Sequence, residues 1–82
     1  MNFKTFLHKE RRDKPAKKIL VNVDEIFRVS NDVPTCSLIL HMMDKDIPVV
    51  MPHCVSRRER GEAIGEYELF QEFRRILSNP EI

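Results

Sequence analysis

Apolar side chains occupy both sides of residues 36–43 (CSLILHMM), the most strongly patterned segment of the chain. Side chains that alternate along a strand point to opposite faces of a sheet. One face should therefore carry Cys36, Leu38, Leu40 and Met42, and the other Ser37, Ile39, His41 and Met43. Residues 44–46 (DKD) predict a turn, and residues 47–51 (IPVVM) predict the return strand of a hairpin. A hairpin with apolar residues on both faces needs a cover on each side.

Two further strands are expected before this hairpin. Residues 19–23 (ILVNV) are rich in β-branched side chains, and residues 25–30 (EIFRVS) continue the pattern after a kink at Asp24. Residues 31–34 (NDVP) predict a loop, because Asn and Asp bond to nearby backbone and proline donates no ladder bond. Pro48 also lacks that donor, so the return strand is expected at a sheet edge.

The clearest helical pattern covers residues 62–77, where apolar side chains recur every three or four positions. Residues 56–61 precede it as a loop or frayed turn, since Gly61 and Gly65 each cost about 1 kcal/mol inside a helix. Residues 1–17 place Phe3, Phe6 and Leu7 at helical spacing before a charged run and Pro15, which ends any short helix there. The fold expected is α+β: a small antiparallel sheet of three or four strands on one C-terminal helix (18–82), with a basic N-terminal arm (1–17).

One helix of about 16 residues is about 24 Å long and covers only one face of such a sheet. The second face would expose a contiguous apolar patch that includes Ile39, Met43 and Val50, and monomers seldom expose such patches. Three candidates could cover this second face: the N-terminal arm, a second copy of the chain, or a foreign partner. A partner-binding surface is therefore expected, and homodimerisation is one form of it.

Charge divides the chain into two parts. Residues 1–18 hold seven basic and two acidic side chains, although the whole chain carries only +1. Such a basic segment can bind nucleic acid, which is the alternative function. The residues expected to contact phosphates are Arg11, Arg12, Lys17, Lys18, Arg57 and Arg58. The rest of the chain is acidic, and its helix can present a negative surface to a basic protein through Glu66, Glu68 and Glu72.

Catalytic and metal chemistry find little support in the residue pattern. Cys36 and His41 point to opposite faces of one strand, and no paired C-x-x-C is present, so no metal site is expected. His53 and Cys54 are adjacent and rarely meet for proton transfer, and the two glycines form no phosphate-binding loop. We expect no enzyme, no cofactor and no small-molecule substrate.

Composition indicates a small folded domain. The chain has 82 residues, 41% hydrophobic and 33% charged, and its apolar runs are far shorter than the ~20 residues needed to span a bilayer. Two cysteines make no disulfide framework, and residues 1–14 do not resemble a secretion signal. A cytoplasmic location without membrane contact is expected.

The order of apolar segments ILVNVDEIFRV, CSLILHMMDKDIPVVM and the final helix, about residues 18–77, resembles the FlbD family of short flagellar-operon proteins. That resemblance implies a strand-rich chain with a terminal helix, linked to motility and without established catalytic residues. The basic arm, the two cysteines and the insert HCVSRRERGEA depart from the family. The strand order also resembles, more distantly, the start of LytTR-type DNA-binding domains, and the size suits a phage-encoded inhibitor. We predict a regulatory or inhibitory protein that acts by protein association.

Overall fold

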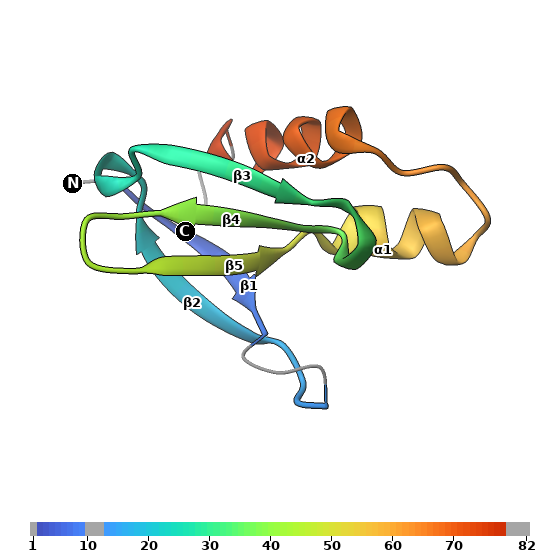
Figure 1. Ribbon diagram of the computed structural model, residues 1–82, viewed down its shortest axis with the longest axis horizontal. Coiled ribbons are helices and arrows are strands. Elements are labelled where there is room, and N and C mark those ends of the chain that lie inside the picture. The colour runs from blue at the N-terminus through green and yellow to red at the C-terminus, as the bar shows by residue number, and fades with distance from the viewer. Residues whose placement is uncertain (1, 10–12, 79–82) are drawn as a thin grey trace.

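The computed structural model describes residues 2–9 and 13–78, which form one antiparallel sheet and two helices. In chain order, the elements are β1 (Phe3–His8), β2 (Lys17–Asn22), η1 (Val23–Glu25), β3 (Arg28–Asp32), η2 (Val33–Thr35), β4 (Ser37–His41), β5 (Asp46–Val50), α1 (Pro52–Glu59) and α2 (Glu66–Ser78). The sheet has five strands in the order β2-β1-β5-β4-β3 (Figure 1). The α+β class is confirmed, and the sheet has more strands than expected.

The N-terminal segment forms a strand, so the expected short helix around Phe3, Phe6 and Leu7 is wrong. β1 pairs with β2 from Phe3 opposite Asn22 to His8 opposite Lys17. This pairing directs Phe6 into the core, where 2% of its surface is exposed, and Leu7 to the other face. Part of the predicted arm therefore lies inside the sheet, next to β5. Arg11 and Arg12 lie outside the described residues.

Helix α2 lies against both halves of the sheet. Phe73 stacks on Phe6 of β1 with ring centroids 5.9 Å apart, and the same helix contacts β3 at the opposite edge. Since β5 and β4 separate β1 from β3, the sheet must curve around the helix. Figure 1 shows α2 beside β3, with β1 and β2 crossing behind β5. The enclosed core includes Phe6, Val21, Leu38, Leu40, Val49, Met51, Leu69 and Phe73.

Pro48 lies in a central strand, which corrects the expected edge position. β5 pairs with β4 along its whole length, but with β1 only through Val50 and Val49. The Pro48 carbonyl accepts a hydrogen bond from His8 Nδ1 at 2.8 Å, so its backbone polar groups point away from β4. The ladder to β4 therefore needs no N–H from Pro48.

A short helix, α1, occupies most of the predicted loop at residues 56–61. Pro52 stands at its first turn, where a missing N–H costs nothing and the fixed φ favours the helix. The carboxylate of Glu72, which is only 4% exposed, accepts hydrogen bonds from the backbone N–H groups of His53 (3.0 Å) and Cys54 (2.8 Å). Glu72 thus caps α1 from a distant part of the chain and joins the two helices.

Helix α2 begins four residues later than predicted, after Gly65. The N–H of Gly65 donates to Glu68 Oε1 at 2.7 Å, which is one half of a capping box. Glu68 therefore stabilises the start of its own helix.

Both cysteines are buried free thiols. Burial, and then the neighbouring Glu72 carboxylate, raises the pKa of Cys54 to about 12, and burial also raises the pKa of Cys36. Both thiols are thus kept protonated and unreactive at neutral pH. Among residues 2–9 and 13–78, no three His, Cys, Asp or Glu side chains gather as metal ligands.

We predict that Glu72→Ala lowers the free energy of unfolding by about 2–3 kcal/mol, because it leaves two N–H groups of α1 without their acceptor. Urea unfolding followed by circular dichroism measures this change. Glu66→Ala, at an exposed position of the same helix, is the matched control and should cost less than about 1 kcal/mol. Equal losses for the two variants would contradict the capping role of Glu72.

Candidate binding surface

The sheet face that points away from α2, here called the outer face, combines apolar and polar side chains in cross-strand rows. Directly paired residues lie on the same face of a sheet. The register places three rows side by side. They are Arg28–His41–Asp46, then Ser30–Ile39–Pro48, then Asp32–Ser37–Val50–Leu7–Lys18. The middle of the outer face is therefore largely apolar, and its borders are charged.

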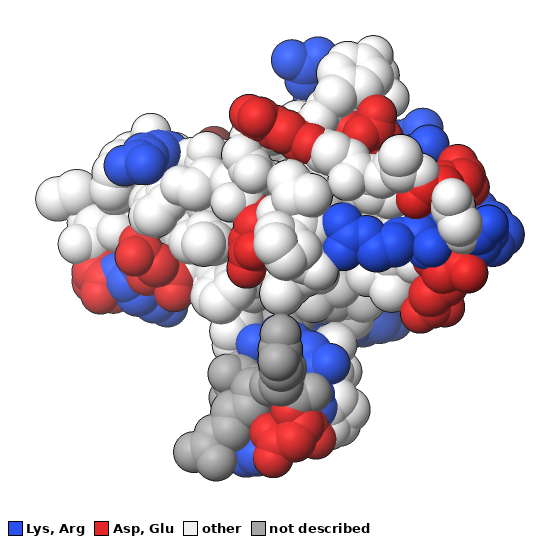
Figure 2. All heavy atoms as spheres, turned by 45° about the vertical axis from the view of Figure 1, so that its right-hand side comes forward, with Lys and Arg blue, Asp and Glu red and all other residues white. Residues whose placement is uncertain are grey.

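A groove of about 610 Å³ lies on this face, where the β1–β2 hairpin projects from the sheet. Its floor is formed by Ser37 and Ile39 of β4 and by Pro48 and Val50 of β5. One wall is the hairpin, with Lys9 and Ala16, and the other wall runs from Asp32 through η2 to Val55 of α1. Figure 2 shows charged side chains gathered around α1 and on the hairpin, with mostly uncharged surface between them.

Three side chains form a hydrogen-bonded relay next to the groove. His41 Nδ1 lies 2.8 Å from Asp46 Oδ1, and His41 Nε2 lies 2.6 Å from Ser30 Oγ. A carboxylate only accepts hydrogen bonds, so Nδ1 donates to Asp46. In the tautomer that is protonated at Nδ1 alone, Nε2 accepts the Ser30 hydroxyl proton. The Phe27 ring, 6.4 Å from the imidazole, packs beside it.

The relay has the order hydroxyl, base and carboxylate that activates serine nucleophiles. It lacks other parts of such a site. Asp46 is 62% exposed, so water screens its carboxylate. Within the described residues, His41 is the only group that hydrogen-bonds the Ser30 hydroxyl. The arrangement therefore orients His41 on the outer face.

The partner-binding residues predicted from the sequence do not form one surface. Ile39 and Val50 lie together on the groove floor. Met43 lies at the turn between β4 and β5, 93% exposed. Glu66 and Glu68 belong to the first turn of α2, on the other side of the sheet. Glu72, expected on an exposed helix face, is buried because its carboxylate caps α1.

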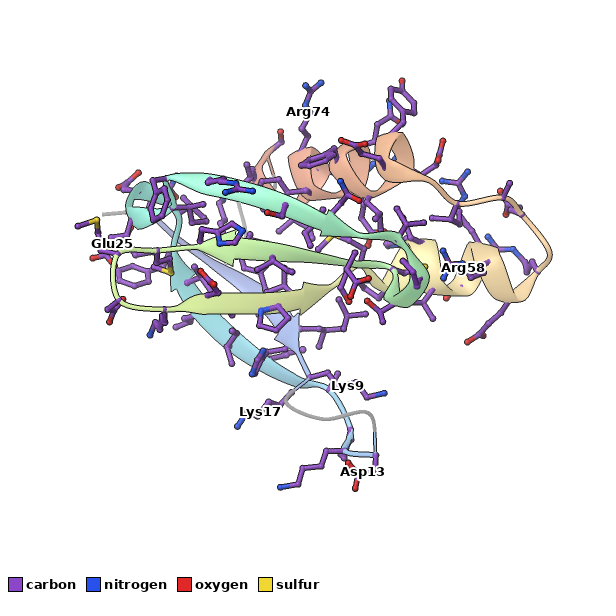
Figure 3. All side chains as sticks on the ribbon, in the orientation of Figure 1. Lys9, Asp13, Lys17, Glu25, Arg58 and Arg74 are labelled. Atoms are coloured by element: carbon purple, nitrogen blue, oxygen red, sulfur yellow. The ribbon has the colours of Figure 1, made fainter. Side chains whose placement is uncertain are left out.

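The basic side chains predicted to bind nucleic acid are partly committed to other contacts. Arg58 donates to the carbonyl oxygens of Val33 (2.6 Å) and Pro34 (2.7 Å) and so ties α1 to η2 (Figure 3). Arg57 Nε lies 3.0 Å from Glu62 Oε1, and this hydrogen bond raises the pKa of Arg57 and lowers that of Glu62. Lys17 and Lys18 lie on exposed β2 positions.

Sequence reasoning missed the second wall of the groove and the relay. Lys9, Asp32 and Val55 come from three segments that only the fold brings together. The relay depends on register, since Ser30 and Asp46 reach His41 from the strands on either side of it. The one sequence signal for the relay was the alternation along residues 36–43, which places His41 and Ile39 on one face.

Comparison with known proteins gives no relative: no family model, no curated protein and no solved structure matches the chain. The resemblance to FlbD-type and LytTR-type proteins stays a prediction. In the part of the chain that the structure describes, neither helix combines the length and apolar character needed to cross a bilayer.

We predict that a fluorophosphonate probe, which modifies activated serines, will label Ser30 no faster than Ser56, an exposed serine of α1 that serves as the control. The reason is that Asp46, the carboxylate that would support His41 as a base, is 62% exposed and screened by water. Peptide mapping by mass spectrometry locates the label. Rapid labelling of Ser30 that is lost in His41→Gln would show a nucleophile and would contradict the expectation that the protein is not an enzyme.

Proposed function

We propose that the protein acts by association, as a regulatory or inhibitory protein whose outer-face groove binds a protein partner. The observation that carries this proposal is the position of the groove: an apolar floor lies on the one sheet face that α2 leaves uncovered. Protein interfaces commonly have such an apolar centre with a polar rim. Here Ile39, Pro48 and Val50 form the centre, and Lys9 and Asp32 stand at the rim.

The polar groups of the groove favour a protein surface over a small ligand. Small-molecule sites use a few polar groups that converge on the ligand. In this groove the Ser37 hydroxyl donates to the Thr35 carbonyl at 3.3 Å, and the Thr35 hydroxyl donates to the Asp32 carbonyl at 3.3 Å. Both hydroxyl protons are thus used within the chain, and apolar contact is the main interaction that the floor offers.

Nucleic-acid binding is the weaker alternative. Arg58 already holds η2 in place, and Arg57 is paired with Glu62, so neither guanidinium is free of protein contacts. The groove itself has an acidic side chain, Asp32, on one wall, which would repel a phosphate backbone. These contacts support the choice of a protein partner.

A differential capture experiment tests the proposal. The immobilised chain is incubated with an extract of its native cells, and bound proteins, including further copies of the chain, are quantified by mass spectrometry. We expect Ile39→Asp and Val50→Asp each to lower recovery of a reproducible partner at least about tenfold, because a charge on the floor is desolvated on binding. Tyr67→Asp, at a 68% exposed position on α2, is the matched control and should keep full recovery.

Folding of each variant is checked by circular dichroism before capture. Identical sets of bound proteins for the wild-type chain and both folded groove variants would contradict the proposal. A partner lost only with Tyr67→Asp would move the binding surface to α2.

A further inference from the structure

We infer that the occupant of the groove is a second copy of this chain, bound face to face about a two-fold axis. This inference rests on the proposed function and names the partner of the same surface. It is carried by the distribution of charge across the groove, whose two walls have opposite signs.

The two charged wall residues are available to a partner. Lys9 extends from the end of β1 on the side of the hairpin away from Lys17 (Figure 3). Asp32, on the facing wall, makes no side-chain cap for η2. Within the described residues, neither side chain forms an ion pair, with the other or with any third group. A free cation and a free anion thus stand on opposite sides of one apolar floor.

A row with an acid at one end and a base at the other can pair with a second, reversed copy of the same row. The row Asp32–Ser37–Val50–Leu7–Lys18 runs from an acid on edge strand β3, through apolar side chains, to a base on edge strand β2. A two-fold axis that lies between the two copies, parallel to the strands and over Val50, reverses the row. It sets Asp32 of one copy against Lys18, the basic end of the row, in the other copy, and by symmetry it makes that contact twice.

Apolar contacts would supply most of the affinity of such a dimer, and the charges would fix its register. Two outer faces stacked in this way form an aligned sheet-on-sheet packing, in which Ile39, Pro48 and Val50 of each copy face the other floor. Rim charge pairs mainly set orientation and association rate, and salt screens them. A chain of 82 residues also gains stability from the added core.

Charge reversal tests the inference by sedimentation equilibrium over a wide concentration range. Asp32→Lys makes both walls basic, and the double variant Lys9→Asp with Lys18→Asp makes both walls acidic, so each of these two variants alone should dimerise at least about tenfold more weakly than the wild-type chain. An equimolar mixture of the two variants should recover a heterodimer, because each acidic wall then meets a basic wall. Asp24→Lys and Lys45→Asp, reversals at exposed positions outside the groove, are the controls and should leave dimerisation unchanged.

The outcomes separate this inference from the proposed function. The second-copy inference is overturned if the wild-type chain stays monomeric at all concentrations, or if the groove variants dimerise as tightly as the wild-type chain. If groove-dependent capture of a different protein persists in that case, the proposed function stands with another partner. If a monomeric chain also captures nothing that depends on Ile39 or Val50, both are wrong.

Discussion

The stacking of Phe73 on Phe6, together with the contact of the same helix with β3, forces a five-stranded sheet to curve around a single helix. The concave side becomes the core, where Leu38, Leu40 and Leu69 have no exposed surface. The buried carboxylate of Glu72 then fixes α1 against α2 by capping its first turn. With both helices held in this way, neither covers the sheet face that points outward, and the groove on that face follows from how the core closes.

The outer face combines two kinds of chemistry. Apolar side chains fill its centre, while the relay of Ser30, His41 and Asp46 satisfies polar groups beside them. A hydrogen-bonded polar group costs less to cover than an unpaired one, so the relay lowers the desolvation cost of placing a partner over this part of the sheet. The same face can thus remain hydrated in the free chain and become covered on association.

Much of the fold could be predicted because local patterns agree with tertiary contacts along β4, β5 and α2. The alternation in residues 36–43 correctly placed Cys36, Leu38, Leu40 and Met42 in the core, while Ser37 on the other face is also buried, with 7% of its surface exposed. The predictions failed for segments whose conformation depends on contacts with residues far away in the sequence. Phe3, Phe6 and Leu7 fit a helix or a strand equally well, and pairing with β2 selects the strand. α1 depends on a cap from Glu72, about 18 positions away, which no local pattern reveals. The sequence predicted an uncovered apolar sheet face but not the groove on it, because the walls of the groove are formed by the hairpin, η2 and α1.

Hydroxyl-radical footprinting at low and high protein concentration tests most directly whether the outer face is open in the free chain and covered on association. We predict that oxidation of Pro48 and Val50 is fast in dilute solution and slows strongly as the protein concentration rises. Oxidation of Tyr67 on α2 should stay constant and serves as the internal reference. If Pro48 and Val50 are oxidised equally at all concentrations, or if Tyr67 is protected in their place, the outer face is not the surface that is covered on association.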